Sequence, residues 1–405
     1  MISYEEARRL VMEQAKIIGR EKVSLENASG RVAAEEIRSK IQVPPFRNSA
    51  VDGYAVRSED TKAENFPARL KLLAEQPAGE YFRKVLKPGQ AVKVMTGAPV
   101  PAGADAVVPV EEAKEQNGFV SVSRAFRPGE NVREAGEDLA AGQVIIRPGI
   151  VLKAPHLGLL AACGAARIIV YKRPRVAALI TGNELCKPGE RLRPGKIYDA
   201  NSTILRALVE SSGAELVSIK QVKDDLDALV RALKAAMKRA DVVLTSGGVS
   251  VGDYDLVKEA ARKLGAREIF WQVAQKPAKP LAFYRAKAGR RPAWIFGLPG
   301  NPGAVMISFE EYVRPFIKKL SGRRDFWPRE IEAVLTSAVK KKRGRLNFIR
   351  VRLEETQGVW KAFPADRQES GIISTLTETD GLALVPAEAD FLPEGTKVKV
   401  HPVEW

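Results

Sequence analysis

The stretch that most constrains the fold is Asp241–Asp255, which reads DVVLTSGGVSVGDYD. Its first five residues are mostly β-branched or apolar without alternation, which is typical of a strand buried on both faces of a parallel sheet. A glycine-rich turn then leads to a helix expected over 256–264, and open α/β sheets bind anions at such turns. The pattern predicts a phosphate site with two aspartates as candidate metal ligands; a tight turn with a capping aspartate is the alternative. The residues of this site are Ser246, Gly247, Gly248, Val249, Ser250, Asp253 and Asp255.

Strands and helices alternate from Arg175 to about Leu320, which predicts a doubly wound parallel sheet. Strands are expected at 176–180, 215–222, 241–245, 269–274, 281–284 and 294–298. The turn Pro299–Gly303 is expected to open a long helix. Because the carboxyl ends of parallel strands share one edge, the polar residues that follow them should converge on a single cleft. These residues are Asn183, Glu184, Asp224, Ser246–Asp255, and Asn301 within the sequence Pro299, Gly300, Asn301, Pro302.

A short basic loop, Lys276-Pro277-Ala278-Lys279-Pro280, lies between two of these strands. Its prolines stiffen the backbone, and its two lysines provide positive charge for an oxyanion. We therefore interpret Lys276 and Lys279 as an oxyanion clamp. The alternative is a solvated basic turn.

Two loops rich in proline and glycine stand out in the first third of the chain. One contains Asp52 within FRNSAVDGYAV, and the other contains Thr96 within MTGAPVPAGADA. Their density of polar groups exceeds what a turn needs, although Asp52 closing an Asx turn is an equally good interpretation. Asp138 closes the same region in GEDL.

The other segments predict three smaller units around the α/β domain. The N-terminus should form an amphipathic helix with Ser3 and Glu6 at capping-box spacing, followed by a strand at 22–24 and a second helix over 28–37. Short strands over 67–132 predict a small β-domain inserted into an N-terminal α+β domain, and strands after about Ser321 predict a C-terminal β-barrel. The expected domains are 1–43 with 137–172 (N-terminal, discontinuous), 44–136 (inserted), 173–320 (α/β) and 326–405 (barrel).

The composition limits which metal sites, disulfides and charged partners the protein can have. The 405 residues include only two cysteines and two histidines, so a zinc cluster or a disulfide framework cannot be built, and a metal would be held by oxygen, as suits Mg²⁺. We expect His156 and His401 to be structural. The net charge of +16 is scattered apart from one run at 340–345, which favours a solvated basic surface over nucleic-acid binding. The acidic start MISYEEARRL and the lack of long apolar runs predict no signal peptide, no membrane span and a cytoplasmic location.

The motifs together closely resemble the molybdopterin molybdenumtransferase family, which includes MoeA and the gephyrin E domain. They are, in order, PPFRNSAVDGYAV, MTGAPVPAGADAVV, GEDL, ITGNEL, IYDANS, TSGGVSVGDYD, KPAKP and GLPGNP. The resemblance spans the whole chain. It implies an elongated homodimer of four-domain subunits, with the first domain contributing to dimerisation. It also implies an enzyme that takes adenylylated molybdopterin and molybdate, cleaves the adenylate with Mg²⁺, and releases molybdenum cofactor and AMP.

The resemblance also implies roles for individual residues. Asp52, Thr96 and Asp138 match acidic or hydroxyl positions of the family's N-terminal half, and Glu184, Asp224 and Asp255 match carboxylates around its cleft. Lys276 and Lys279 match the lysine loop near molybdate, and Pro299 and Pro302 match the Pro-Gly-Asn-Pro turn. Arg350 and Ser370 match positions presented to the partner subunit's cleft. The sequence departs from the family pattern at Asn183, Ala278 and Gly303, where Asp, Gly and Val are usual.

These roles predict metal-assisted attack without a covalent enzyme intermediate. Amides of the glycine-rich turn would hold the pterin phosphate, and Glu184, Asp224, Asp253 and Asp255 are the candidate Mg²⁺ ligands. Partners would be a second subunit and, further, the molybdopterin adenylyltransferase and molybdoenzyme apoproteins. The alternatives are an enzyme of the preceding adenylylation step, a molybdopterin-binding scaffold, and a silent or tungstate-preferring paralogue.

Overall fold

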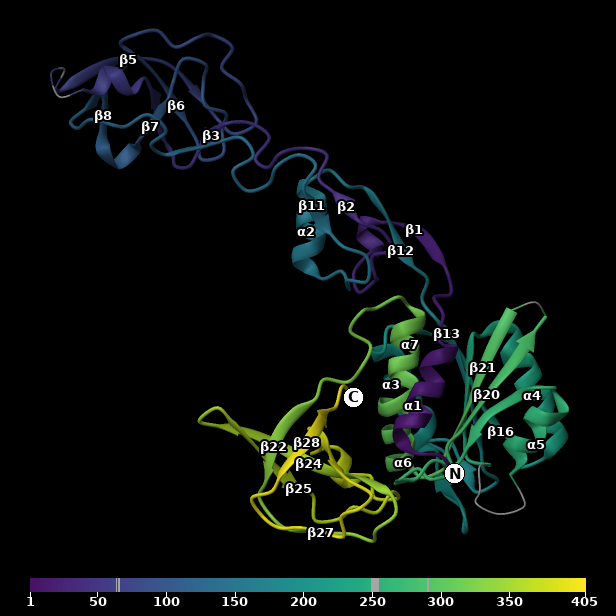
Figure 1. The fold of residues 1–405 in the computed structure, drawn as a ribbon. Helices are drawn as coiled ribbons and strands as arrows, with labels where there is room; N and C mark the ends of the chain where they lie inside the picture. The colour runs from purple at the N-terminus through teal and green to yellow at the C-terminus, as the bar shows by residue number, and fades with distance from the viewer. Residues whose placement is uncertain (63, 65, 249–254, 290) are drawn as a thin grey trace.

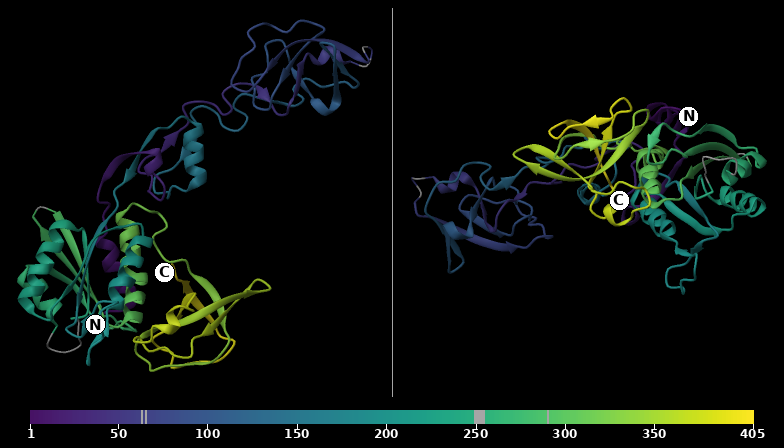
Figure 2. Two further views of the ribbon diagram at one scale, coloured as in Figure 1. Left: turned by 180° about the vertical axis from the view of Figure 1, so that it is seen from behind. Right: turned by 90° about the horizontal axis from the view of Figure 1, so that it is seen from below.

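The computed structural model describes residues 1–405 apart from 63, 65, 249–254 and 290. The molecule is elongated (Figures 1 and 2). A small β-domain lies at one end, a slender lobe follows it, and an α/β domain and a β-barrel lie side by side at the other end. The chain runs out through the slender lobe to the small β-domain and returns by the same route.

The α/β domain is built on a six-stranded sheet in the order β16-β13-β17-β21-β20-β18. Its strands are β13 (Arg175–Thr181), β16 (Glu215–Val222), β17 (Val242–Ser246), β18 (Arg267–Trp271), β20 (Ala282–Ala288) and β21 (Arg291–Leu298). All five residues of β17 are buried at the centre of the sheet, as its unbroken apolar pattern predicts. The four strands from β16 to β21 are parallel.

The last two strands correct the prediction of a wholly parallel sheet. β20 runs antiparallel to both β21 and β18, so the sheet is mixed. The reason is connectivity: no helix separates β18, β20 and β21, and a parallel pair needs a long crossover whereas an antiparallel pair can be joined by a short loop.

Helices cover both faces of this sheet. One face packs against the N-terminal helix and three later helices, and the other packs against α4 and α5. Their bounds are α1 (Tyr4–Gln14), α3 (Ala200–Ser211), α4 (Leu226–Arg239), α5 (Leu256–Lys263), α6 (Pro302–Ser308) and α7 (Arg314–Leu320). The long helix expected after Pro299–Gly303 is interrupted between α6 and α7 by a π-helical segment, η5 (Phe309–Val313), whose five residues are all buried. A small pair of strands, β14 (Leu185–Cys186) and β15 (Ile197–Tyr198), projects beside the sheet.

The slender lobe consists of two strand pairs, one short 3-10 helix and one α-helix. These elements are β1 (Arg20–Ser24) paired with β12 (Arg167–Tyr171), β2 (Ile37–Arg38) paired with β11 (Val144–Ile146), η1 (Leu25–Asn27) and α2 (Ala154–Ala162). The helix predicted over 28–37 is wrong. Val32 and Ala33 instead form isolated bridges to Val151 and Val170, so the apolar residues of this segment are buried against strands. His156 is structural: its Nδ1 accepts from the Lys153 amide (3.0 Å) at the start of α2.

The inserted unit contains a six-stranded sheet in the order β7-β4-β6-β5-β9-β8. Its elements are β4 (Gly53–Val56), η2 (Ser58–Thr61), β5 (Ala68–Gln76), β6 (Gln90–Val94), β7 (Ala106–Pro109), η4 (Val110–Glu112), β8 (Ala113–Gln116) and β9 (Phe119–Val122). A short pair, β3 (Asn48–Ser49) with β10 (Val132–Arg133), lies where the chain enters and leaves this unit.

The C-terminal strands close into a barrel, because β24 pairs with both β25 and β26. The elements are β22 (Ile331–Leu335), β23 (Val339–Lys340), β24 (Leu346–Thr356), β25 (Val359–Pro364), η6 (Ser374–Leu376), β26 (Gly381–Val385), β27 (Phe391–Leu392) and β28 (Lys397–Pro402). β19 (Gln275–Lys276), from the basic loop of the α/β domain, pairs with β24 and so joins the two domains. In the described part of the chain, no helix is long and apolar enough to cross a membrane.

Candidate functional site at the carboxyl edge of the sheet

The glycine-rich turn after β17 packs directly against the end of β13. Gly247 has φ +83°, and a Cβ there would lie 2.5 Å from the Thr181 carbonyl oxygen. The glycine is therefore required by the close approach of two loop backbones as well as by its left-handed conformation. Ser246 is almost fully buried (1% exposed). Val249, Ser250 and Asp253, which the sequence also assigned to this site, lie outside the described residues.

Asn201, in the first turn of α3, joins the loops that follow two strands. Its Nδ2 donates to Ser246 Oγ (2.9 Å) and to the Gly300 carbonyl (2.7 Å), and Ser246 Oγ donates to the Pro299 carbonyl (3.2 Å). The side chain is 91% buried, and its Oδ1 has no hydrogen-bond partner among the described residues. Asn201 therefore fixes the position of the glycine-rich turn after β17 relative to the Pro-Gly-Asn-Pro turn.

Sequence reasoning missed Asn201 as a site residue, and also its neighbour Asp199. Both lie in IYDANS, which contributed only as one motif of the family resemblance. Asp199 caps α3: its Oδ1 accepts from the Ser202 amide (2.9 Å), and its Oδ2 accepts from Gln221 Nε2 (2.9 Å). A polar Asp-Ala-Asn-Ser run at the start of an amphipathic helix, directly after a strand pair, is the signal that could have identified them.

Asn183 and Asp224 bind each other across two neighbouring loops. The Asn183 amide donates to Asp224 Oδ2 (2.8 Å), and the Asp224 amide donates to Asn183 Oδ1 (3.3 Å). Lys196 Nζ donates to the Asn183 carbonyl. The exposed Glu184 carboxylate lies over the backbone of Gly182 at the same edge. The structure thus brings the 181–184 and 222–225 loops together, as predicted.

Asp255 takes the capping geometry that the sequence offered as an alternative. It is 8% exposed, its Oδ1 accepts from the Lys258 amide (2.9 Å), and its Oδ2 accepts from Trp271 Nε1 (3.0 Å). Burial raises the pKa of this carboxyl, and the hydrogen bond from the Lys258 amide opposes that rise. A metal ion at Asp255 would have to compete with the helix cap.

The oxygen donors at this edge suit Mg²⁺ only in part. Across the described residues, no three Asp, Glu, His or Cys side chains gather closely enough to hold a metal ion. Asp224 and Glu184 are both exposed, and neither forms an ion pair with any residue that the structure describes. Because Mg²⁺ commonly binds one or two carboxylates together with substrate phosphates and waters, these two side chains fit it when the ligand supplies further oxygens.

The basic loop lies between the sheet and the barrel. Lys276 is exposed and Lys279 is half-buried, while Gln275 between the two domains is fully buried and donates to the Ala278 carbonyl (3.3 Å). Ala278 has φ +67°, the left-handed region that glycine enters without strain. The backbone therefore keeps a glycine-type conformation although the side chain is alanine. Lys276 also lines a cavity of about 210 Å³ that the barrel closes on its other side.

Ser370 and Arg350 reach the same region from the barrel. Asn301 Nδ2 donates to Ser370 Oγ (2.9 Å), and the Gly303 amide donates to the Ser370 carbonyl (2.9 Å). Arg350 is 2% exposed, and its guanidinium donates to the carbonyls of the loop that carries Ser370. The acceptors are Arg367 (2.7 Å), Ile372 (3.0 Å) and Glu369 (3.1 Å). Burial lowers the pKa of Arg350. Ser370 thus contacts the Pro299–Pro302 turn of its own chain, and Arg350 shapes the loop that holds it.

Asp52 and Thr96 contact each other in the inserted unit, and Asp138 follows in the segment where the chain leaves that unit. Asp52 Oδ1 accepts from the Thr96 amide (2.6 Å) and from Thr96 Oγ1 (2.8 Å), and these bonds lower the pKa of Asp52, the amide having the larger effect. Asp138 is exposed, and its amide donates to the Val43 carbonyl (3.1 Å). The inserted unit lies at the far end of the molecule from the sheet edge (Figure 1). Within one chain, the Asp52–Thr96 pair of the inserted unit therefore lies far from the described site residues at the sheet edge.

Comparison with known proteins gives one consistent result over nearly the whole chain. Three family models match: the MoeA N-terminal region (domain I and II) at residues 2–164, a probable molybdopterin binding domain at 177–319, and the MoeA C-terminal region (domain IV) at 332–403. A molybdopterin molybdenumtransferase from Nostoc is 37% identical over 93% of this chain and 87% of its own length. One from Haemophilus influenzae is 34% identical over 99% of this chain and 98% of its own.

Solved structures agree with the sequence relatives. A molybdopterin biosynthesis MoeA protein from Pyrococcus horikoshii superposes with a TM-score of 0.84 at 33% identity, covering 99% of both chains. A second structure of such a protein from Pyrococcus horikoshii gives a TM-score of 0.80 at 30% identity with full coverage of both chains.

Proposed function

Since the chain belongs to the molybdopterin molybdenumtransferase family of molybdenum cofactor biosynthesis, we propose that it inserts molybdate into adenylylated molybdopterin and releases AMP in an Mg²⁺-dependent reaction. The observation that carries this proposal is the network at Asn201. A single buried amide holds together the glycine-rich turn and the Pro-Gly-Asn-Pro turn at the carboxyl edge of the sheet, where α/β folds bind phosphorylated ligands.

The proposed roles of the residues at this edge differ according to their charge. Amides of the turn at Ser246–Gly248 face the pterin phosphate, with Val249 and Ser250 continuing the same turn in the sequence. Lys276 and Lys279 hold the molybdate oxyanion, and Ser370 and Asn301 orient the ligand between sheet and barrel. Mg²⁺ bound at Asp224 and Glu184 would neutralise the adenylate phosphates, with Asp253 and Asp255 as further candidate ligands. Rate enhancement then comes from positioning and electrostatics, without a covalent enzyme intermediate.

We further propose that the working unit is a homodimer of four-domain chains. Its support is the position of the inserted unit, which carries Asp52 and Thr96, at the far end of the molecule from the sheet edge of the same chain, because a second subunit could supply these two residues and Asp138 to the cleft. The domain limits proposed are those expected from the sequence: 1–43 with 137–172, 44–136, 173–320 and 326–405. The molybdopterin adenylyltransferase and molybdoenzyme apoproteins are the proposed protein partners, and the cytoplasm stays the predicted location.

The test is AMP release from adenylylated molybdopterin by the purified protein with Mg²⁺ and molybdate. We expect release to need both additions and to fall at least tenfold in Asp224→Asn and in Lys276→Gln. Lys84→Gln, an exposed lysine of the inserted unit, is the matched control and should retain full activity. Unchanged release in Asp224→Asn would contradict the metal assignment.

Three further arms distinguish the rival functions. Tungstate in place of molybdate reports oxyanion preference. Tight nucleotide binding without AMP release would indicate a scaffold or silent paralogue. ATP-dependent consumption of molybdopterin would indicate the adenylylation step instead.

A further inference from the structure

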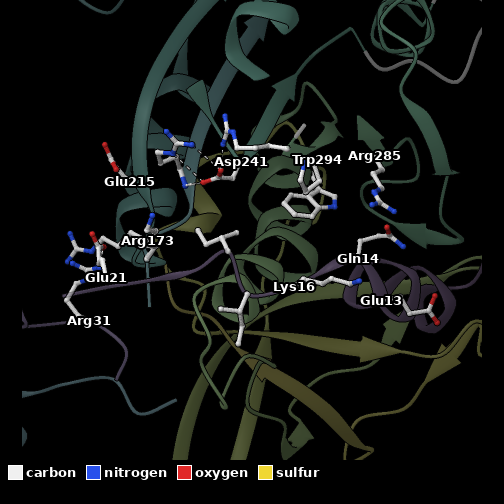
Figure 3. Close-up of a pocket in the computed structure, with 16 residues that line it drawn as sticks. Glu13, Gln14, Lys16, Glu21, Arg31, Arg173, Glu215, Asp241, Arg285 and Trp294 are labelled. Carbon is white, nitrogen blue, oxygen red and sulfur yellow. Dashed lines mark hydrogen bonds and ion pairs between the residues drawn. The ribbon is translucent and has the colours of Figure 1, made fainter. Parts of the chain in front are cut away.

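A second large cavity lies at the opposite edge of the sheet from the proposed active site. It has a volume of about 1020 Å³ and is lined by the amino-terminal ends of β13 and β21, by Asp241 just before β17, and by residues of the slender lobe (Figure 3). Its wall includes Lys172 and Arg173, from one of the two chain segments that connect the lobe to the α/β domain. The Lys172 amide donates to the Gly19 carbonyl (3.0 Å) of the other connecting segment.

Positive charge dominates this cavity. Its lining carries seven cationic and four acidic side chains. The cations are Lys16, Arg31, Lys172, Arg173, Arg175, Arg285 and Arg291, and the acids are Glu13, Glu21, Glu215 and Asp241. A concave surface lined mainly by one sign of charge focuses the electrostatic potential and attracts ligands of the opposite sign.

Three of the arginines are paired with acids inside the wall. Arg175 and Arg291 share Asp241 (Nη2–Oδ1 3.3 Å and Nη1–Oδ1 3.0 Å), and Arg31 pairs with Glu21. These pairs use two of the four acids.

A third acid is also occupied, because Glu13 pairs with Arg9 (2.5 Å), which is not part of the lining. Four cations of the lining then remain. Among the residues that the structure describes, none of these four has a carboxylate within 4.0 Å, and Glu215 is the one acid of the lining without an ion pair. These cations are Lys16, Lys172, Arg173 and Arg285.

Two buried donors in the wall also lack partners. Trp294 is 4% exposed and Arg31 is 9% exposed, and neither Trp294 Nε1 nor Arg31 Nε has a hydrogen-bond acceptor in the described structure. A buried donor without a partner costs about 1–3 kcal/mol. Figure 3 shows the Trp294 indole beside the cavity, with Arg285 and Gln14 on the side of its ring nitrogen. Arg173 and Arg31 lie together at the other end.

We propose that this cavity binds a small molecule with two separated anionic groups, phosphate or carboxylate. One group lies at Arg285 and Trp294 and the other at Arg173 and Lys172, with Lys16 between the two domains contributing to both. The ligand therefore bridges the α/β domain and the slender lobe at their junction. This site is independent of the proposed catalytic edge, because none of its residues lies there.

Binding is measured by isothermal titration calorimetry on the full-length protein in phosphate-free buffer with EDTA, using inorganic pyrophosphate and, in a second arm, succinate. We expect binding of at least one of the two, weakening as salt is raised because the contacts are ionic. The double variant Arg173→Gln/Arg285→Gln should raise the Kd at least tenfold. Both side chains are exposed and make no ion pair in the described structure, so the double variant should fold normally, which an unchanged melting temperature would verify.

Two matched variants separate this cavity from other basic surfaces. Lys84→Gln tests general surface charge, and Lys276→Gln tests binding at the catalytic edge; both should retain the wild-type Kd. Trp294→Phe removes the indole N–H while keeping an aromatic ring, and should weaken binding severalfold. The proposal is overturned if neither anion binds, if the Arg173→Gln/Arg285→Gln protein binds as tightly as wild type, or if only Lys276→Gln loses binding.

Discussion

At the scale of single residues, the site depends on a few short hydrogen bonds, and removing each one should change a pKa or a local stability in a direction that the contacts predict. Asp52 and Thr96 are the simplest pair, because both are exposed and the effect is local. Asn201 is the opposite case, since its side chain is buried and each of its bonds joins separate loops.

Thr96→Val keeps the backbone amide donor to Asp52 and removes the hydroxyl donor. We expect the pKa of Asp52 to rise toward its ordinary value while remaining below it. Because the folded-state pKa is lowered, the stabilisation from this pair is present above the ordinary pKa and is lost as the pH falls through the folded-state pKa. A ¹³C-carboxyl NMR titration measures the shift. Thr96→Ser should leave the pKa unchanged, and an unchanged pKa in Thr96→Val would contradict the assignment.

Asn201→Ala leaves Ser246 Oγ and the Gly300 carbonyl without their shared donor. We expect the local free energy of opening at the ends of β17 and β21 to fall by about 1–3 kcal/mol. Amide hydrogen exchange measures that change, and AMP release should fall with it because the two turns lose their relative position. Thr203→Ala, an exposed position on the same helix, should change stability by no more than about 0.5 kcal/mol. Equal effects of the two substitutions would count against the proposed role.

At the scale of elements, α6 and the barrel loop can approach each other closely because Gly303 has no side chain. A Cβ on Gly303 would lie 2.9 Å from the Ser370 carbonyl oxygen and 3.4 Å from its Cα. The same oxygen accepts from the Gly303 amide, so the close approach and the hydrogen bond occur together. In the π-helical η5, the neighbouring Glu310 and Glu311 are both buried with different partners: Glu310 accepts from Arg314 (2.8 Å) and Glu311 accepts from Tyr4 Oη (2.6 Å).

Gly303→Val should push the Ser370 loop away from the Pro-Gly-Asn-Pro turn. We expect a cost of about 1–3 kcal/mol from overpacking and faster hydrogen exchange at the residue 303 amide. The matched control is Gly158→Ala in α2, where a Cβ meets nothing within 4 Å and stability should rise by about 0.4–1 kcal/mol. Unchanged exchange at residue 303 would show that the loop accommodates the side chain.

At the scale of the whole molecule, a buried polar network joins the N-terminal helix, the α/β domain and the barrel. Tyr4 Oη donates to Glu311 Oε2 (2.6 Å), and His401 Nδ1 from β28 lies 2.9 Å from Glu311 Oε1. Glu311 is fully buried. The ring of Tyr4 also packs edge-on against Phe348 of β24 (5.3 Å between centroids). These contacts make α1 part of the interface between the α/β domain and the barrel, and they confirm that His401 is structural.

Glu311→Gln replaces the shared carboxylate with an amide that cannot accept from both neighbours. We expect a loss of about 1–3 kcal/mol, since the amide leaves one of the two buried neighbours without its hydrogen-bond partner. A lower melting temperature by differential scanning calorimetry measures the loss. Glu259→Gln, exposed on α5, should melt like the wild type. Equal melting temperatures for both variants would contradict the bridging role of Glu311.

The sequence by itself determined the elements with a strong local pattern. The buried β17 follows from an unbroken apolar run, and the carboxyl-edge loops and barrel strands follow from short strand patterns and turn chemistry, which are local properties. The loops at Asn183 and Asp224 were predicted to meet for the same reason, since parallel strands must end at one edge. Motif resemblance added the family, which the comparisons confirm.

Tertiary structure decided what depends on distant partners. The apolar spacing of residues 28–37 fits a helix, yet Val32 and Ala33 form bridges to Val151 and Val170, more than 100 residues away. The antiparallel β18 and β20, the π-segment around Glu311, and the buried Asn201 between two turns likewise depend on groups that no local window contains. Burial of a polar side chain is favourable only when its partner arrives from elsewhere in the chain, and the cationic cavity between two domains exists only once both have folded.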